Sequence, residues 1–183
     1  MRIIAGEFRS RKLKTLEGGN TRPTQDKLRG AIFSSIGPYF DGQSFLDLFA
    51  GSGACGLEAK SRGCDYVVLN DKNPKASRII KENVKDLKVK CEIYNLDYIQ
   101  LLDQFKNYRF DYIFLDPPYK LKVINEILTI IDQNQMLSEN GKIIVESSIE
   151  DTYGQLKFNS FMFLKEKEYR LTRITYFKYK KGE

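Results

Sequence analysis

The sequence of 183 residues contains no histidine and no tryptophan. Without histidine, the chain cannot form Ser–His or Cys–His nucleophile systems, the usual His-containing zinc sites, or imidazole acid–base chemistry near neutral pH. Its three cysteines, Cys55, Cys64 and Cys91, show no C-x-x-C spacing, which argues against a disulfide framework and a zinc finger. We therefore expect no metal site, and any reaction must use other groups.

Hydrophobic runs long enough to span a membrane are also missing. No uninterrupted apolar stretch approaches about 18 residues, and the N-terminus lacks a charged segment followed by an apolar one. Neither secretion nor membrane insertion is indicated, so we expect a cytoplasmic protein. Hydrophobic residues make up 42% of the chain and charged residues 30%, which is enough apolar material for a sizeable core.

The positive charge is concentrated at the two ends of the chain. The net charge is +6. Residues 1–30 contain 8 basic and 3 acidic side chains, residues 165–183 contain 7 and 3, and the middle is net negative. A clustered basic surface is typical of a polyanion binder, although solvated Lys and Arg faces are common. Charge alone therefore leaves both interpretations open.

Residues 17–24 form the clearest candidate linker, because they are rich in glycine and end in Arg22-Pro23-Thr24. We predict an N-terminal extension over residues 1–24 and one larger domain over residues 25–183. Residues 2–16 have short β-type pieces and predict a small hairpin. Thr24 is a candidate N-cap for the helix that follows the linker. The outer face of the predicted hairpin carries four basic side chains, Arg9, Arg11, Lys12 and Lys14.

From Ser44 onward, apolar strand-like runs alternate with amphipathic stretches, which is typical of an α/β fold with a mostly parallel sheet. One helix is expected to begin near Leu57, and apolar stripes over residues 76–87 and 124–131 indicate two more. The tail, residues 157–180, predicts two further strands that form an antiparallel hairpin at the sheet edge. The other strands are expected at Phe45–Phe49, Tyr66–Leu69, Cys91–Tyr94, Tyr112–Leu115 and Ile143–Glu146.

A glycine-rich turn follows the first of these strands. Gly51, Gly53 and Gly56 match the pattern G-x-G-x-x-G, and Asp71 lies twenty residues after Gly51. This pattern alone is also that of a dinucleotide site, with Asp71 on a ribose hydroxyl. Asp47 lies at the end of the strand, however, where its carboxylate would repel a pyrophosphate. The turn is therefore better suited to a ligand with a cationic group.

S-Adenosylmethionine meets this description. It carries an ammonium group for Asp47 to attract, a ribose diol for Asp71 to bind, and no phosphate. The backbone at Gly51 and Gly53 would lie against it without interference from a Cβ atom. Asp97, just past the third strand, is placed to contact the adenine amino group, with helix capping as its alternative role. The sequence therefore predicts S-adenosylmethionine as the cofactor.

The segment Asp116-Pro117-Pro118-Tyr119 follows the fourth strand, at the edge where open α/β sheets bind ligands. Two consecutive prolines stiffen the backbone and remove two N–H donors, so the segment presents acceptors. An exocyclic base amine has two hydrogens, which Asp116 and the Pro117 carbonyl could accept while the nitrogen lone pair faces the methyl donor. Tyr119 would stack on the base. Asp116 or water could take the released proton, so no histidine is needed.

The segments Asp47–Gly56 and Asp116–Tyr119, in this order, resemble the class I S-adenosylmethionine-dependent amino-methyltransferases. Four N-terminal pieces make the chain similar to the bacterial 16S rRNA guanine-N2 methyltransferase family: Arg2–Gly6, Arg11–Leu13, Thr21–Thr24 with Asp26, and Ala31–Phe33. The likeness runs from Met1 to about Ser147. It implies a Rossmann-like methyltransferase fold, with a mostly parallel seven-stranded sheet, helices on both faces and a terminal antiparallel strand.

The resemblance also implies a reaction, which is methyl transfer from S-adenosylmethionine to the N2 amine of a guanine in 16S rRNA, within a 30S subunit or an assembly intermediate. Two departures are visible, since family members often have Glu in place of Asp71 and Gly in place of Ser10. The implied cofactor contacts are Asp47, Ala50, Gly51, Gly53, Asp71 and Asp97. The implied target-base site is Asp116, Pro117, Pro118 and Tyr119. The residues expected to face RNA are Arg9, Arg11, Lys12, Lys14, Arg22 and Thr24.

Three alternatives remain open on the sequence. An adenine-N6 DNA methyltransferase would use Asp116–Tyr119 equally well, but the chain has no large insertion to read duplex DNA and deliver a flipped base. A non-catalytic RNA-binding module on the same fold would not require Asp47 or Asp116. A small dinucleotide oxidoreductase rests on the glycine pattern alone.

Overall fold

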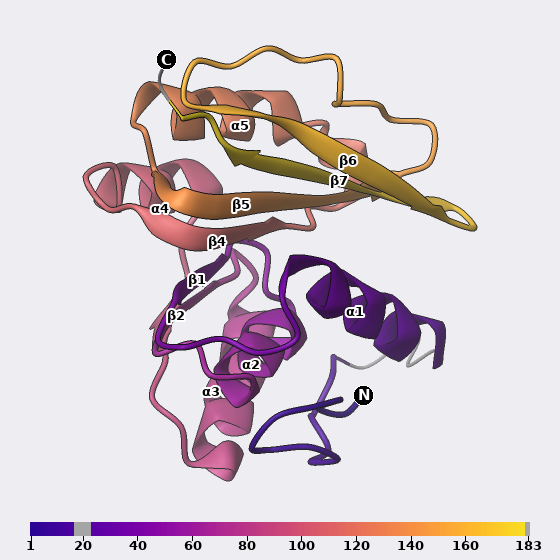
Figure 1. Cartoon of the computed structure of the whole chain (residues 1–183). Helices are drawn as coiled ribbons and strands as arrows, with labels where there is room; N and C mark the ends of the chain where they lie inside the picture. The colour runs from indigo at the N-terminus through magenta and orange to yellow at the C-terminus, as the bar shows by residue number, and fades with distance from the viewer. Residues whose placement is uncertain (17–22, 182–183) are drawn as a thin grey trace. The chain divides into compact units, whose positions relative to one another are not determined.

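The computed structural model describes residues 1–16 and 23–181, which form two compact units, Met1–Asp97 and Tyr98–Glu183. Each unit is α/β (Figure 1). Within the described ranges, no helix is both long enough and apolar enough to cross a membrane.

The first unit contains a parallel three-stranded arrangement in the order β3-β2-β1. Strand β1 (Ser44–Asp47) is buried along its whole length, and it pairs in parallel with β2 (Tyr66–Asn70). Strand β3 (Glu92–Tyr94) is short and pairs with β2. Burial on both faces explains why the first two strands are nearly continuous apolar runs rather than alternating ones.

Three helices accompany these strands: α1 (Pro23–Ile36), α2 (Ala54–Ser61) and α3 (Pro74–Leu87). Helix α3 has a well-defined start, because the Asn73 side chain accepts a hydrogen bond from the Lys75 backbone N–H at 3.0 Å and Pro74 occupies the first turn. The predicted apolar stripe of this helix is its packing face, since it supplies Ala76, Ile80 and Leu87 to the core.

The second unit contains the strand order β4-β5-β7-β6. Strands β4 (Phe110–Leu115) and β5 (Leu137–Ser148) are parallel, whereas β7 (Thr172–Tyr179) runs antiparallel to both β5 and β6 (Phe161–Tyr169). The predicted antiparallel hairpin in the tail is confirmed. With the three strands of the first unit, the described residues contain the seven strands expected. The helical elements here are α4 (Tyr98–Gln104), the 3₁₀ turn η1 (Tyr119–Leu121) and α5 (Ile124–Gln133).

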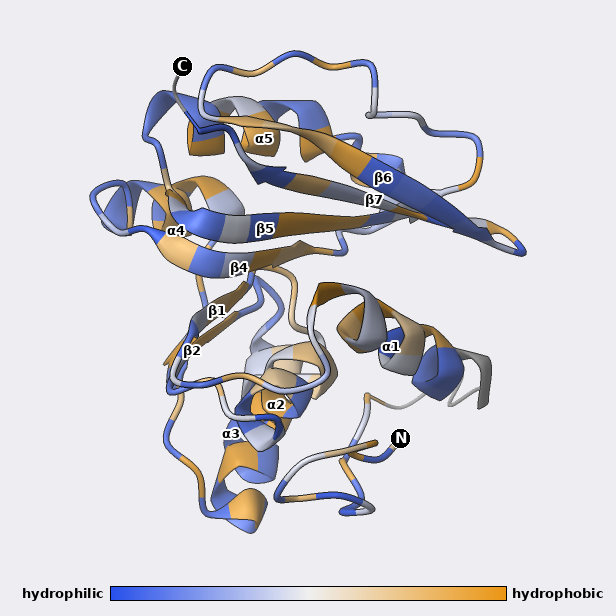
Figure 2. Cartoon of the chain, in the orientation of Figure 1, coloured by the Kyte–Doolittle hydropathy of each residue, from blue (hydrophilic) through white to orange (hydrophobic). Residues whose placement is uncertain are grey.

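The core of the second unit lies between α5 and the strands, and it includes buried side chains of β6 and β7. Helix α5 buries the predicted stripe of Ile124, Ile127, Leu128 and Ile131. In Figure 2 the hydrophobic colour of β5 gathers toward its C-terminal half, whereas β6 becomes hydrophilic toward its end. This difference follows position, because β5 has a neighbouring strand on each side and β6 pairs only with β7.

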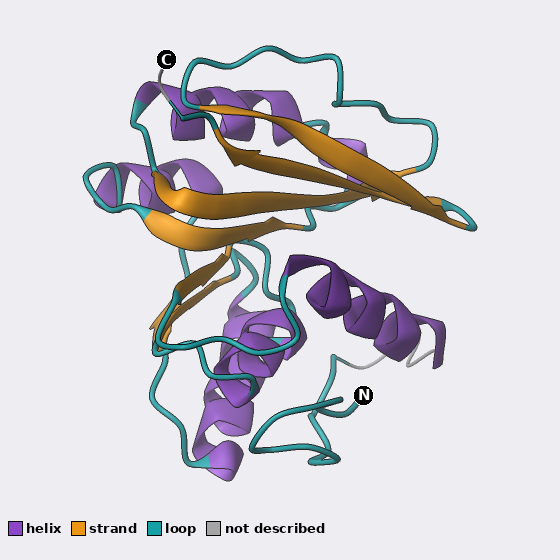
Figure 3. Cartoon of the chain, in the orientation of Figure 1, coloured by secondary structure: helices purple, strands orange, loops and turns teal. Residues whose placement is uncertain are grey.

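The prediction of an N-terminal β-hairpin is wrong. Residues 1–16 are loop and turn apart from one isolated bridge between Arg2 and Lys12 (Figure 3). Side chains of α2 explain the missing strand ladder, since Glu58 accepts the backbone N–H groups of Ile4 at 2.8 Å and Ala5 at 3.0 Å. Pairing with the second arm therefore stops after Ile3, whose N–H donates to the Arg11 carbonyl at 2.9 Å, because the next two N–H groups go to Glu58 instead.

The start of α1 also differs from the prediction. The helix begins at Pro23, so Thr24 lies inside the first turn and is not the N-cap. Proline is favoured at this position because its φ angle suits the helix and its missing N–H is not needed there. The predicted linker residues 17–22, including Arg22, lie outside the described residues.

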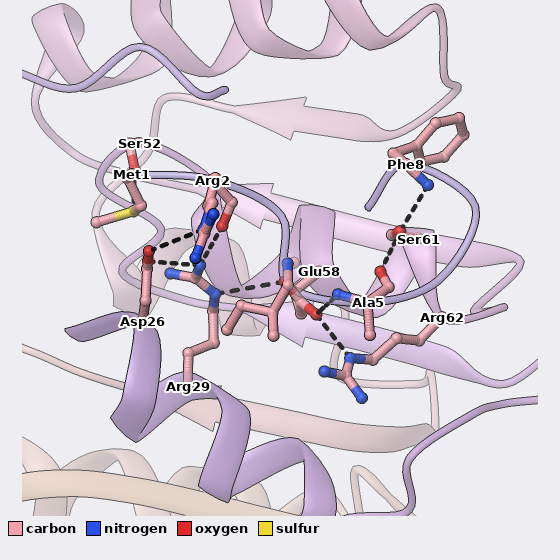
Figure 4. A network of polar contacts seen from close by, with 12 residues as sticks. Met1, Arg2, Ala5, Phe8, Asp26, Arg29, Ser52, Glu58, Ser61 and Arg62 are labelled. Atoms are coloured by element: carbon pink, nitrogen blue, oxygen red, sulfur yellow. Dashed lines mark hydrogen bonds and ion pairs between the residues drawn. The ribbon is translucent and has the colours of Figure 1, made fainter. Parts of the chain in front are cut away.

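Glu58 is the centre of a buried polar network that joins the N-terminal segment to α1 and α2 (Figure 4). Besides the two backbone donors, its carboxylate binds the Arg62 Nε at 2.7 Å and lies 3.5 Å from the Arg29 Nε. Arg29 also bonds to the Arg2 carbonyl and to Asp26. A buried carboxylate is tolerated here because charged and backbone donors surround it.

We predict that Glu58→Ala lowers the free energy of unfolding by about 3–5 kcal/mol, because two buried guanidinium groups lose their anion. Urea unfolding followed by circular dichroism measures this loss. Glu82→Ala is the control, since Glu82 is a half-exposed ion-pair partner of Lys14 and its removal is expected to cost less than about 1 kcal/mol. Equal losses in the two variants would contradict the central role of Glu58.

Candidate functional site

The glycine turn after β1 is open to solvent only in part, since Gly51 is half-buried and Gly53 is buried. Gly51 and Gly53 have φ angles of +57° and +82°, in the left-handed region that favours glycine. A Cβ atom at Gly51 would meet no heavy atom within 4 Å, so this part of the turn faces open space. Helix α2 begins at Ala54, directly after the turn and three residues earlier than predicted. At Gly51 the turn thus offers accessible backbone close to a helix N-terminus.

Asp47 fixes the position of this turn through a hydrogen bond to α2. Its side chain is buried, and its Oδ2 atom accepts the backbone N–H of Gly56, in the first turn of α2, at 3.0 Å. Gly56 is needed for close packing, because a Cβ atom there would overlap the Leu69 side chain. The structure thus gives Asp47 a positioning role, and a direct contact with a ligand ammonium stays a prediction.

Asp71 connects the end of β2 to the glycine turn. Its Oδ2 atom accepts the Gly51 N–H at 2.8 Å, and its Oδ1 atom accepts the Asn73 N–H at 2.8 Å. A carboxylate offers about four acceptor positions, so two remain after these bonds. The side chain is only half-buried, which leaves those positions within reach of a diol. The binding of ribose by Asp71 stays a prediction that this geometry allows.

Asp97, the third predicted acidic contact, forms an ion pair with Lys72. The distance from Lys72 Nζ to Asp97 Oδ2 is 2.9 Å, and the lysine is largely exposed. One oxygen of the Asp97 carboxylate is therefore already bound by a lysine. The predicted contact with an adenine amino group stays a prediction.

Asn70 is a positioning residue that the sequence analysis did not single out. Its buried side-chain amide donates to the carbonyls of Leu48 and Leu96 at 3.1 Å each, and its carbonyl oxygen accepts the Leu96 N–H at 3.1 Å. One side chain therefore fixes the chain after β1 and after β3. The available signal was an amide at the end of the apolar run Tyr66–Leu69, where a buried polar group must find partners.

In the second unit, the four residues Asp116–Tyr119 follow β4 directly. Asp116 is half-buried and Pro117 is buried, whereas Pro118 and Tyr119 are exposed. Tyr119 is 41% exposed, and its hydroxyl lies 3.5 Å from the Thr172 hydroxyl at the start of β7. An accessible aromatic ring thus follows a carboxyl group and a stiff, donor-free backbone.

A second carboxyl group, Glu146, accompanies Asp116, and the sequence analysis gave it no role. Leu115 of β4 pairs with Val145 of β5, so Asp116 and Glu146 are the next residues along two neighbouring parallel strands. Burial raises the pKa of Asp116 to about 7. Burial, and then the negative charge of Asp116, raise the pKa of Glu146 to about 9. Below neutral pH this pair is therefore protonated.

Four of the six predicted RNA-facing residues fall into two groups. Arg11 donates to the Asp86 carbonyl at 2.8 Å, and Lys14 forms ion pairs with Glu82 and Asp86 of α3 at 3.1 and 3.0 Å. The side chains of Arg9 and Lys12 are exposed. Thr24 lies in the first turn of α1, and Arg22 lies outside the described part of the chain.

Known families and proteins match this chain over most of its length. The family described as Conserved hypothetical protein 95 matches residues 1–178. YlbH of Bacillus subtilis (strain 168) is 40% identical over 186 residues, which cover 97% of this chain and 98% of that protein. Ribosomal RNA small subunit methyltransferase D of Haemophilus influenzae is 34% identical over 151 residues, 80% of this chain and 78% of that protein. The same-named protein of Escherichia coli (strain K12) is 33% identical, with coverages of 82% and 76%.

Solved structures agree with this result. The structure of yhhF from Escherichia coli has a TM-score of 0.85 and 29% identity, over 100% of this chain and 99% of that chain. A more distant structure, SMU.776 complexed with SAH, has a TM-score of 0.63 and 18% identity, over 85% of this chain and 49% of that chain. At that identity the likeness concerns the fold alone.

We predict that Asn70→Ala lowers the free energy of unfolding by about 2–3 kcal/mol, because it leaves backbone groups of Leu48 and Leu96 without their partner. The control is Asn95→Ala, which removes an exposed amide whose bond goes to the Asp71 carbonyl and should cost less than about 1 kcal/mol. Denaturant unfolding of both variants gives the comparison. An Asn70 variant as stable as the Asn95 variant would refute the positioning role.

We also predict that Glu146→Gln makes stability less dependent on pH. The folded pKa of Glu146 lies above its ordinary value of about 4.5, so between about pH 5 and pH 9 the folded protein keeps a proton that the unfolded chain has lost. Because folding must then take up that proton, the free energy of unfolding falls as pH rises through this range. Thermal or urea unfolding across this range measures the effect. Glu139→Gln, an exposed position on the same strand, is the control and should leave the wild-type pH dependence intact.

Proposed function

Because the chain belongs to the Conserved hypothetical protein 95 family, together with the ribosomal RNA small subunit methyltransferases D, we propose that it transfers a methyl group from S-adenosylmethionine to the N2 amine of a guanine in 16S rRNA. The observation that carries this proposal is the order of two features: a glycine turn that is open at Gly51 and is held by two strand-end carboxylates, and then Asp116–Tyr119 after β4. The substrate would be 16S rRNA within a 30S subunit or an assembly intermediate.

The first unit supplies the residues that fit the cofactor. S-Adenosylmethionine, when bound, supplies a methyl group already activated on a sulfonium. Ala50, Gly51 and Gly53 form the turn whose backbone would lie against the methionine part, with the open space at Gly51 as supporting geometry. Asp71 would accept from the ribose hydroxyls with the acceptor positions that Gly51 and Asn73 leave unused. Asp97 would receive the adenine amino group beside Lys72.

The second unit supplies the residues for the target base. Asp116 and the Pro117 carbonyl would accept the two hydrogens of the exocyclic amine, which leaves the nitrogen lone pair for the methyl carbon. Tyr119 would stack on the base through its exposed ring. The nitrogen releases one proton on methylation, and Asp116 or water would take it. A pKa near 7 suits this task, because a base works best when its pKa is near the working pH.

The assignment to a guanine in rRNA, rather than an adenine in DNA, rests on the named relatives and on the basic N-terminal segment. The exposed Arg9 and Lys12 would contact RNA phosphates. Arg11 and Lys14 would contribute less, because α3 already binds them. Methylation of duplex DNA in preference to 16S rRNA would reverse this assignment.

We predict that Asp116→Asn lowers the rate of methyl transfer at least about 100-fold, while the affinity for S-adenosylmethionine changes little. Transfer of tritiated methyl groups to unmodified 16S rRNA or 30S particles measures the rate, calorimetry measures the affinity, and mass spectrometry locates the methylated nucleotide. In the wild-type protein, the rate should fall as pH decreases through about 7, because Asp116 then becomes protonated and accepts less well.

Asp103→Asn is the matched control for this experiment. It removes an exposed carboxylate of the same unit whose partner is Lys106, and it should leave both the rate and its pH dependence unchanged. Undiminished activity of the Asp116 variant, or a loss of the same size in the Asp103 variant, would contradict the role proposed for Asp116.

A further inference from the structure

Two hollows flank the N-terminal turn, which we define as residues 5–10. The first has a volume of about 420 Å³ and lies between the N-terminal segment and α1. The second has a volume of about 530 Å³ and lies between the turn, the end of α2 and the loop that follows α1. Arg9 lines both hollows. Their volumes are in the range of small-ligand sites, and each is large enough for part of a nucleotide.

The first hollow is lined by cationic side chains. Arg2, Arg9 and Lys27 line it, and all three are exposed, against the single carboxylate of Asp26. Asp26 is already engaged by Arg29 at 2.9 Å and, more distantly, by Arg2 at 3.9 Å. In residues 1–16 and 23–181, neither Arg9 nor Lys27 forms a side-chain hydrogen bond or ion pair. The hollow therefore presents cations that are available to an external anion.

The second hollow contains an exposed aromatic ring. Tyr39 is 67% exposed and lines this hollow together with Arg9. Its backbone is held on both sides, because the Pro38 carbonyl accepts a bond from Arg62 Nη1 at 2.8 Å and the Phe40 N–H donates to the Arg62 carbonyl at 2.8 Å. The Tyr39 ring is therefore not part of the core, although the backbone that carries it is fixed. A fixed, accessible ring is suited to stacking.

The same end of α2 positions the N-terminal turn. The Ser61 carbonyl accepts the Glu7 N–H at 2.8 Å, and the Ser61 hydroxyl accepts the Phe8 N–H at 3.0 Å and donates to the Ala5 carbonyl at 2.6 Å. Gly6 has a φ of +83°, and a Cβ atom there would overlap the Ser61 backbone. Ser61, the last residue of α2, and Arg62, its C-cap, thus fix the turn that carries Arg9 and the loop that carries Tyr39.

We propose that these two hollows form a binding site for an unpaired RNA nucleotide, with its phosphate bound by Arg2, Arg9 and Lys27 and its base stacked on Tyr39. The charge matches a phosphate, and Arg9 at the junction lies where phosphate and base sides of a nucleotide would meet. A duplex base has its faces covered by its neighbours, whereas an unpaired base can stack on a side chain. The site therefore selects a loop, bulge or single strand. It rests on the proposed function, since it assumes an RNA substrate.

Fluorescence anisotropy with a labelled single-stranded RNA and a labelled duplex of the same sequence tests this site. Arg9→Gln/Lys27→Gln should weaken binding of the single strand about 10-fold and reduce the slope of log affinity against log salt by about 1.4, because two phosphate contacts are lost. Lys81→Gln/Lys85→Gln, which removes two exposed charges from α3, is the matched control and should change affinity less than about 2-fold.

The ring is tested separately. Tyr39→Ala should weaken binding of the single strand at least about 5-fold without changing the salt slope, and it should leave duplex binding unchanged. Tyr39→Phe should restore wild-type affinity because it keeps the stacking face. The free energy of unfolding of every variant shows whether a loss comes from misfolding, and Tyr39→Phe with the α3 control provides folded references.

Several results would overturn the site. Equal losses in the two double variants would indicate a general electrostatic attraction, and wild-type affinity of Tyr39→Ala for the single strand would remove the stacking role. Binding of free nucleotide as tight as that of RNA would show a small-molecule site instead. Failure of the proposed function would look different, since the wild-type protein would then show this RNA-binding pattern but transfer no methyl group to 16S rRNA.

Discussion

The buried carboxylate of Glu58 is the interaction on which the first unit depends most. An ion without water is costly, and the cost is offset only where donors surround it. Here two backbone N–H groups from the N-terminal segment and two guanidinium groups, from α1 and from the end of α2, supply those donors. One side chain thereby determines where the basic N-terminus lies. Removal of the anion would leave these buried donors without a partner, so replacing Glu58 alone is expected to be strongly destabilising.

The acidic residues discussed above have two kinds of role. Asp47 and Asp71 use oxygen atoms to hold the glycine turn and α2, so they fix the backbone that we propose to bind the cofactor. Asp116, just after β4, and Glu146, within β5, instead occupy adjacent positions of two paired strands, and burial raises both pKa values. A chain without histidine thereby obtains a group that titrates near neutral pH. Environment, rather than residue type, supplies the property that imidazole usually provides.

Much of the fold was predictable from local patterns. The strand runs, the helical stripes of α3 and α5, and the antiparallel tail follow from apolar periodicity, which depends only on neighbouring residues. The glycine turn and Asp116–Tyr119 were also visible, because each is contiguous. The N-terminal hairpin was not predicted correctly, since Glu58 lies more than fifty residues away from the backbone donors that it captures. Asn70 and Glu146 were missed for the same reason, because their partners are distant in sequence.

The sequence by itself determined the class of chemistry. The absence of histidine, the order of the two motifs and the division of charge are properties of the chain as written, and they pointed to an activated donor and an amine acceptor. Only the tertiary structure decided which charged groups are available. Arg11 and Lys14 are bound by α3, whereas Arg9 and Lys27 face a hollow. Whether a charge is free depends on what lies beside it in space, and that is decided by packing.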